Sequence, residues 1–195
     1  MPKYGLTGGI ASGKTVALQI FNEYGVDTID TDELARLVID RGTEGARKLR
    51  EAIGEQYFFD GALERQRLRE DMYQSPALKK TVESIIHPLV RNALDQWMRK
   101  DSKSPYQILC SPLLIETNQH ETLDGVIIVD TPESIQLARG IGRDSCSEDT
   151  IQKIIAAQLS RHARLKHATF VIDNSGDLGS LAQQIHILHE KLSHG

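Results

Sequence analysis

The chain has 195 residues, 39% hydrophobic and 26% charged, which predicts one compact globular unit with room for a small inserted subdomain. The formal net charge is −4, from 23 Lys and Arg residues and 27 Asp and Glu residues. A protein that binds along a nucleic-acid backbone usually has an excess of basic residues, so no nucleic-acid partner is expected. Cys110 and Cys146 are far apart, and neither a signal segment nor an apolar run near the roughly 20 residues of a membrane span is seen. We therefore expect a soluble, cytoplasmic protein without membrane contact.

The first elements predict a strand, a glycine-rich turn and a helix. The strand covers Lys3 to Thr7, and the helix runs from Lys14 to Tyr24 with an apolar side. A second strand follows at Val26 to Asp30, and Thr31 or Asp32 can cap the next helix. Together these elements predict a βαβ unit.

From about 43 to 103 the pattern is mostly helical and predicts an insertion between strands. A turn is expected around Asp60-Gly61, followed by a long amphipathic helix from Ser75 onward. Pro88 lacks an amide donor and is expected to kink or divide this helix after His87. Apolar residues at helical spacing in this run are Leu78, Val82, Ile85, Ile86, Leu89, Val90, Leu94 and Trp97.

The remaining chain again alternates strands and helices. Strands are predicted at 106–110, 125–130 and 169–173, and helices from Thr131-Pro132 onward, over 150–165 and over 178–192. Strands that are apolar on both faces and alternate with helices are typical of a parallel sheet covered on both sides. The predicted fold class is therefore α/β, with a doubly wound parallel five-stranded sheet.

The turn after the first strand matches G-x-x-x-x-G-K-[ST] and lies between a predicted strand and helix, as that motif requires. Glycines let the backbone wrap a polyphosphate with its amides inward, and the helix N-terminus adds positive potential. Lys14 is expected to reach the β- and γ-phosphates, and the Thr15 hydroxyl to ligate Mg²⁺. The expected nucleoside triphosphate contacts are Gly8, Gly9, Ile10, Ala11, Ser12, Gly13, Lys14 and Thr15.

A phosphate loop alone does not separate a kinase from a switch or a motor. A switch-type GTPase needs an Asn-Lys-x-Asp or Thr-Lys-x-Asp segment late in the chain, and the sequence has neither. The D-x-x-G match at Asp173 to Gly176 follows the last strand, which is too late for a γ-phosphate sensor. Guanine-nucleotide switching is therefore not expected.

The segment "DTDELAR" suggests an acceptor site. Asp32 and Arg36 are four residues apart, which places both on one face of a helix. A kinase that acts on an alcohol needs a carboxylate near the hydroxyl and a cation for an anionic acceptor. Alternatively, Asp32 only caps the helix and Arg36 forms a surface ion pair.

In chain order, "LTGGIASGKT", "VDTIDTDELAR", "HPLV", "SPLLIE" and "QLARGIGRD…IIAAQLSRHARL…VIDN" together resemble dephospho-coenzyme A kinase over essentially the whole chain. The resemblance implies a P-loop kinase fold with a helical acceptor-binding insertion and a lid, and ATP and Mg²⁺ as cofactors. It implies transfer of the γ-phosphoryl to the ribose 3′-hydroxyl of dephospho-coenzyme A, the last step of coenzyme A biosynthesis. Asp32 would be the catalytic carboxylate and Arg36 an acceptor contact.

His87 and Glu116 each allow two interpretations. A lone histidine on the apolar side of a helix is usually packed in the core, whereas the resemblance makes His87 an acceptor contact. Glu116 after the third strand could contact the acceptor or cap a helix.

Arg139 and Arg143 share a helical face next to two glycines, and this pattern is typical of a lid, which we expect near 138–149. Such a lid closes over the nucleotide and stabilises charge on the transferred phosphoryl. The alternative is a solvated helix end. Gln158, Arg161 and Arg164 are interpreted mainly as structural residues on a helical face that forms ion pairs. The alternative is that one of them contacts phosphate.

By the resemblance, Asn174 follows the last strand where the family contacts adenine. The sequence does not decide which of Asp30, Asp130 or Asp173 supports Mg²⁺. Ala11 stands where the family often has glycine. A monomer or weak homo-oligomer with only small-molecule substrates is expected. Two alternatives remain: another small-molecule P-loop kinase, such as a nucleoside or nucleotide kinase, and an NTP-dependent binding module without phosphotransfer.

Overall fold

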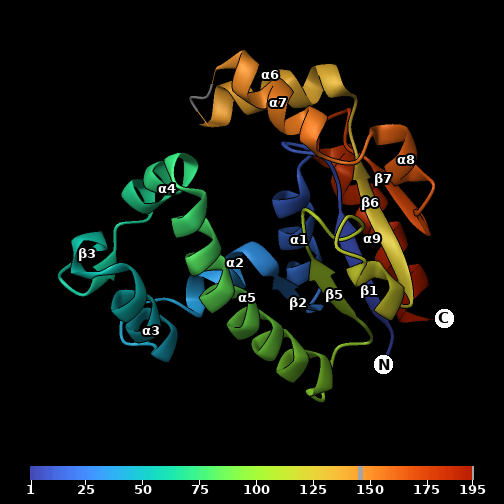
Figure 1. Ribbon diagram of the computed structural model, residues 1–195. Helices are drawn as coiled ribbons and strands as arrows, with labels where there is room; N and C mark the ends of the chain where they lie inside the picture. The colour runs from blue at the N-terminus through green and yellow to red at the C-terminus, as the bar shows by residue number, and fades with distance from the viewer. Residues whose placement is uncertain (145–146, 195) are drawn as a thin grey trace. The chain divides into compact units, whose positions relative to one another are not determined.

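The structure is a computed structural model that describes residues 1–144 and 147–194, without the side chains of 143 and 144 (Figure 1). The chain forms two compact units, described separately below. The sheet unit comprises Met1–Asp30 and Ser102–Gly195, and the helical unit comprises Thr31–Asp101. Within the described residues, no helix is both long enough and apolar enough to cross a membrane.

The sheet unit is built on five parallel strands in the order β2-β5-β1-β6-β7. Leu6 of β1 is level with Cys110 of β5 on one side and with Ile127 of β6 on the other. The predicted doubly wound parallel sheet is confirmed. Because the strands are parallel, the residues that follow them meet at one edge. The strands are β1 (Lys3–Thr7), β2 (Asp27–Asp30), β5 (Gln107–Cys110), β6 (Gly125–Asp130) and β7 (Phe170–Asp173).

Both faces of this sheet are covered. Helices α1 (Lys14–Glu23) and α9 (Leu178–Ser193) pack against each other and close the main apolar core on one face. On the other face, a Cβ at Gly5 would lie 2.4 Å from Leu114 Cδ2, so the segment after β5 packs closely on the strand and a side chain at Gly5 would displace Leu114. Each large side chain buried in this way contributes about 1.5–3 kcal/mol.

The sheet unit continues beyond β6 with a pair of helices side by side, α6 (Glu133–Asp144) and α7 (Glu148–Ala157), and then α8 (Arg161–Leu165) (Figure 1). The single helix predicted over 150–165 is wrong, because the chain leaves the helix at Gln158, whose backbone is extended. Ser160 then starts α8, since its Oγ atom accepts a hydrogen bond from the Ala163 amide.

The helical unit begins at Thr31, earlier than the start near 43 expected from sequence, because α2 packs against α5. The predicted turn at Asp60 and Gly61 joins a short antiparallel hairpin, and both residues have positive φ angles of 46° and 77°. The elements of this unit are α2 (Thr31–Leu37), α3 (Glu44–Ile53), the 3₁₀ helix η1 (Glu55–Tyr57), β3 (Phe58–Phe59), β4 (Ala62–Leu63), α4 (Arg65–Gln74) and α5 (Pro76–Arg99).

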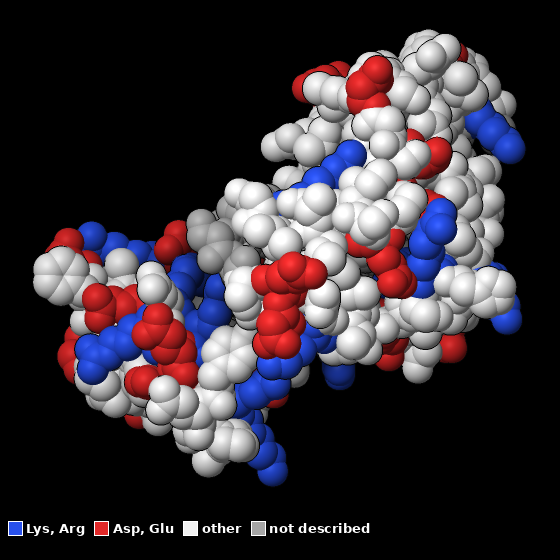
Figure 2. All heavy atoms as spheres, turned by 90° about the horizontal axis from the view of Figure 1, so that it is seen from above, with Lys and Arg blue, Asp and Glu red and all other residues white. Residues whose placement is uncertain are grey.

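Helix α5 runs without a break through Pro88, so the expected division after His87 is wrong. Packing compensates for the missing amide donor, because Val82 is buried and its apolar neighbours join the core of the helical unit. On the face seen in Figure 2, charged side chains of both signs are interspersed. Several form exposed ion pairs, among them Arg47 with Glu44 and Glu51.

Candidate active site

The phosphate loop (Gly8–Thr15) joins β1 to α1 and depends on two glycines. Gly13 precedes α1 with φ 94°, and a Cβ there would lie 2.1 Å from Asn174 Nδ2. A Cβ at Gly8 would lie 2.4 Å from the Val129 carbonyl oxygen. Both distances are shorter than real Cβ atoms allow, so the loop requires glycine at the two positions that define the motif.

Ala11 lies at the left-handed φ of 53°, at the position where the sequence departs from glycine. This conformation costs a residue with a Cβ about 1–2 kcal/mol. Hydrogen bonds within the loop help offset the strain, since the Ser12 amide donates to the Gly9 carbonyl at 3.2 Å. The Lys14 ammonium crosses the loop and donates to the carbonyl oxygens of Gly8 and Gly9 at 2.9 and 2.8 Å.

The ends of β6 and β7 hold the loop at Ser12, which is fully buried. The Ser12 carbonyl oxygen accepts hydrogen bonds from Asn174 Nδ2 at 2.7 Å and from Thr131 Oγ1 at 3.2 Å. The backbone amide of Asn174 donates a hydrogen bond to the backbone carbonyl oxygen of Asp130 at 2.8 Å. The sequence predicts a nucleotide contact at Asn174, whereas Thr131 is predicted only as part of a helix start. Its position directly after a buried strand was the available signal.

Arg139 on α6 reaches this same strand-end cluster. Its Nη1 atom donates to the Asn174 carbonyl oxygen at 3.0 Å, so a lid arginine predicted from sequence lies beside the predicted nucleotide-binding asparagine. The side chain of Arg143 lies outside the described residues, as do 145 and 146 of the lid segment expected near 138–149.

The two aspartates that end β6 and β7 have different partners. Asp130 is buried and accepts from both Nε and Nη2 of Arg161, at 2.9 and 2.6 Å, and this hydrogen bonding raises the pKa of Arg161. Asp173 is exposed, and hydrogen bonds from the side chain and amide of Ser175 lower its pKa. The ion-pair interpretation is therefore confirmed for Arg161.

The short segment between α7 and α8 touches both the loop and Glu116. Gln158 Oε1 accepts from the Ile10 amide at 2.9 Å, and Glu116 Oε1 accepts from the Leu159 amide at 3.0 Å. Arg164 is buried and donates to the Leu159 carbonyl oxygen at 2.6 Å, and burial lowers its pKa. The Gln158 contact to the loop was missed from sequence, because it joins residues 148 positions apart.

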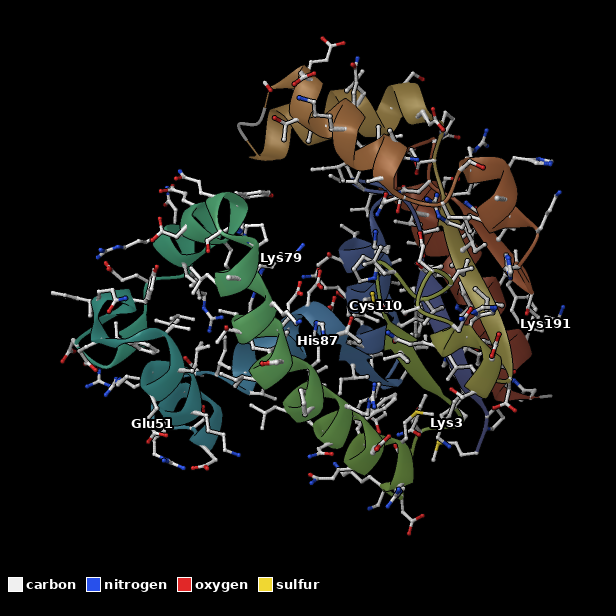
Figure 3. The ribbon with its side chains drawn as sticks, viewed as in Figure 1. Lys3, Glu51, Lys79, His87, Cys110 and Lys191 are labelled. Atoms are coloured by element: carbon white, nitrogen blue, oxygen red, sulfur yellow. The ribbon has the colours of Figure 1, made fainter. Side chains whose placement is uncertain are left out.

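The remaining predicted site residues belong to the helical unit. Asp32 and Arg36 are exposed residues of α2. His87 is an exposed residue of α5, labelled in Figure 3, so its interpretation as a packed core residue is wrong. Since α2 packs against α5, the helical unit brings the three residues onto two neighbouring helices.

Comparisons with known proteins identify the family of the chain. A family model described as dephospho-CoA kinase matches residues 3–180. A dephospho-CoA kinase of Acinetobacter baylyi is 44% identical over 187 residues, which are 95% of this chain and 95% of that protein. TT1252 from Thermus thermophilus superposes with a TM-score of 0.80 at 26% identity, over 98% of this chain and 97% of that chain. A dephospho-CoA kinase from Campylobacter jejuni shares the fold, with a TM-score of 0.73 at 24% identity over 98% and 96% of the two chains. The chain therefore belongs to the dephospho-CoA kinase family.

Proposed function

We propose that this protein transfers the γ-phosphoryl group of ATP to the ribose 3′-hydroxyl of dephospho-coenzyme A, giving coenzyme A and ADP. The observation that carries the proposal is the phosphate loop clamped at the carboxyl edge of the sheet by Thr131 and Asn174, in a chain that matches the dephospho-CoA kinase family over residues 3–180. The reaction is the final step of coenzyme A biosynthesis.

The nucleotide side of the reaction is assigned to the sheet unit. The phosphate loop from Gly8 to Thr15 surrounds the phosphates, with the Ile10 amide bonded to Gln158 instead of the nucleotide, and the N-terminus of α1 adds positive potential. The Lys14 ammonium donates to carbonyl oxygens of the loop in this structure, and it would turn to the β- and γ-phosphates when ATP binds. Asn174 is assigned to the adenine end of the ATP site.

Mg²⁺ fits this chemistry as an ion held mostly by the phosphates and water. Thr15 supplies a hydroxyl in the first turn of α1. Among the described residues, no three His, Cys, Asp or Glu side chains form a cluster that could hold a metal ion. Bound Mg²⁺ would neutralise charge on the phosphates. Asp30, Asp130 and Asp173, at the carboxyl ends of β2, β6 and β7, are the candidate carboxylates to support the ion, and Asp130 also accepts from Arg161.

The acceptor side is assigned to Asp32, Arg36 and His87 of the helical unit and to Glu116 of the sheet unit. Asp32 would orient the 3′-hydroxyl and take its proton as the oxygen attacks the γ-phosphorus and the bond to the ADP oxygen breaks. Arg36 would hold an anionic group of the acceptor. Glu116 is restrained by its bond to the Leu159 amide, which leaves its second oxygen as the expected acceptor contact.

Arg139 and Arg143 are proposed to act from the lid. Cations of a closing segment stabilise the charge that develops on the transferred phosphoryl, and closure keeps out water that would otherwise hydrolyse ATP. Arg139 lies against the backbone carbonyl of Asn174, the residue assigned to the adenine side, which supports its assignment to the nucleotide site. The proposed enzyme is cytoplasmic and a monomer or weak homo-oligomer.

A specificity assay tests the proposal. Initial rates of ADP formation with ATP and Mg²⁺ are measured for dephospho-coenzyme A, adenosine and AMP as acceptors. We expect kcat/KM for dephospho-coenzyme A to exceed the other two by orders of magnitude. Preference for adenosine or AMP would instead identify a nucleoside or nucleotide kinase, and ATP binding without turnover on any acceptor would favour a binding module.

A further inference from the structure

We infer that Gln158 is a positioning residue of the phosphate loop: its side-chain carbonyl fixes the Ile10 amide and so sets the loop conformation that receives ATP. The inference deepens the proposed function and rests on it for the identity of the reaction. Gln158 contacts the loop from the segment that joins α7 to α8, whereas Asn174 contacts it from the end of β7.

The contact lies where the loop is strained. Ile10 is half-buried and immediately precedes Ala11, whose positive φ of 53° is unfavourable for a residue with a Cβ. The bond from the Ile10 amide to Gln158 Oε1 measures 2.9 Å, well within the range of a good hydrogen bond. Together with the two bonds at the Ser12 carbonyl, it fixes the loop on both sides of Ala11.

Gln158 is itself mounted on a restrained segment. Its amide donates to the Ile155 carbonyl at 3.2 Å and closes α7. The next residue, Leu159, is held at its amide by Glu116 and at its carbonyl oxygen by the buried Arg164. Because the backbone on either side of the side chain is fixed, Gln158 can impose a position on the loop rather than follow it.

The surroundings make a clean substitution possible. Gln158 borders an open hollow of about 460 Å³ between α6 and α7, whose other lining residues include Leu137, Gln152 and Ile155. A methionine of similar length therefore has room at this position, and it replaces the carboxamide, including the accepting oxygen, by a thioether. Gln152 lines the same hollow, but its amide donates to Glu148 at 3.0 Å on its own helix, so Gln152→Met is a matched control.

The test compares Gln158→Met, Gln158→Glu and Gln152→Met with the wild type in three measurements. Calorimetry gives the Kd for ATP, steady-state kinetics give KM and kcat, and ¹⁵N NMR follows hydrogen exchange of the Ile10 amide. For Gln158→Met we expect the Kd and KM for ATP to rise about three- to tenfold, the effect of losing one hydrogen bond. The Ile10 amide should exchange faster, with kcat and the KM for dephospho-coenzyme A unchanged. Gln158→Glu keeps an accepting oxygen and should retain slow exchange at Ile10, and Gln152→Met should match the wild type.

Unchanged ATP affinity or unchanged Ile10 exchange in Gln158→Met would overturn the inference. An equal loss of ATP affinity in Gln152→Met would also overturn it. So would a rise in the KM of both substrates in Gln158→Met together with a lower melting temperature, because that combination would indicate general structural damage. Failure of the wild type to phosphorylate dephospho-coenzyme A would refute the proposed function alone, because ATP affinity and Ile10 exchange do not depend on the acceptor.

Discussion

The Nδ2 atom of Asn174 lies 2.7 Å from the carbonyl oxygen of Ser12, although 162 residues separate them in the chain. The end of the last strand thus completes a loop that the first strand begins. The backbone carbonyl oxygen of Asn174 also accepts a hydrogen bond from Arg139 Nη1. One residue therefore connects the phosphate loop to the helix that carries the proposed lid arginine.

Gly13→Ala should disable the loop. Its Cβ would collide with Asn174 Nδ2, and its φ of 94° is unfavourable for alanine, so both the Asn174 clamp and the start of α1 must shift. We expect ATP binding to be lost in calorimetry and the melting temperature to fall. Gly25→Ala is the matched control, because φ there is 76° but no atom lies within 4 Å of the added Cβ. It should cost only about 1–2 kcal/mol of stability and keep ATP affinity. Equal ATP affinity in the two variants would refute the clamp.

Asp32→Asn should separate chemistry from nucleotide binding. The amide cannot take the proton of the acceptor hydroxyl, so we expect kcat to fall by about 10²- to 10⁴-fold. The Kd for ATP, measured by calorimetry, should stay unchanged, because Asp32 is outside the phosphate loop. Asp40→Asn, another exposed carboxylate of the helical unit, should keep wild-type turnover. Turnover in Asp32→Asn close to that of Asp40→Asn would exclude Asp32 as the base.

Arg161→Ala should destabilise the fold. Asp130 is only 7% exposed, and the substitution would remove the guanidinium that engages both of its oxygens. Leaving a buried carboxylate without this partner costs about 1–3 kcal/mol, visible as a lower urea midpoint. Arg47→Ala removes an arginine whose partners Glu44 and Glu51 are exposed, and should cost at most about 1 kcal/mol. Similar losses in both variants would show that burial of Asp130 does not matter.

Asp173→Asn should change the response of stability to acid. Hydrogen bonds from Ser175 lower the pKa of Asp173 in the folded state, so the ionised carboxylate stabilises the fold above its unfolded pKa. That contribution disappears as the pH falls through the folded pKa. The wild type should therefore be the more stable protein in urea at pH 7, and the difference should shrink in acid. A difference that grows as the pH falls would contradict the assigned direction of the shift.

The sheet and the phosphate loop could be predicted from sequence because their signals are local. The motif from Gly8 to Thr15 lies between a strand and a helix, and strand ends such as Asp130 are marked by apolar runs. The contacts that shape the loop could not be predicted in this way. Ile10 meets Gln158, and Ser12 meets Thr131, across 148 and 119 residues, and these pairings exist only once the strands are ordered.

The errors also have physical causes. Helical periodicity runs through Gln158 and hides the break, which comes from the extended backbone of Gln158 and the Ser160 cap. Pro88 suggested a division of α5, but tertiary packing around Val82 keeps the helix continuous. His87 shares a helix with apolar residues, yet its side chain is exposed, because periodicity gives a helical face only approximately.

The proposed reaction transfers a phosphoryl group to one hydroxyl and requires the acceptor. The most direct measurement incubates the purified protein with ATP, Mg²⁺ and dephospho-coenzyme A, quantifies ADP with and without the acceptor, and locates the new phosphate by mass spectrometry and ³¹P NMR. We expect ADP to form only when the acceptor is present, in an amount equal to that of coenzyme A, which carries a single added phosphate at the ribose 3′-position. ADP released at the same rate without acceptor, or a phosphate at another position, would contradict it.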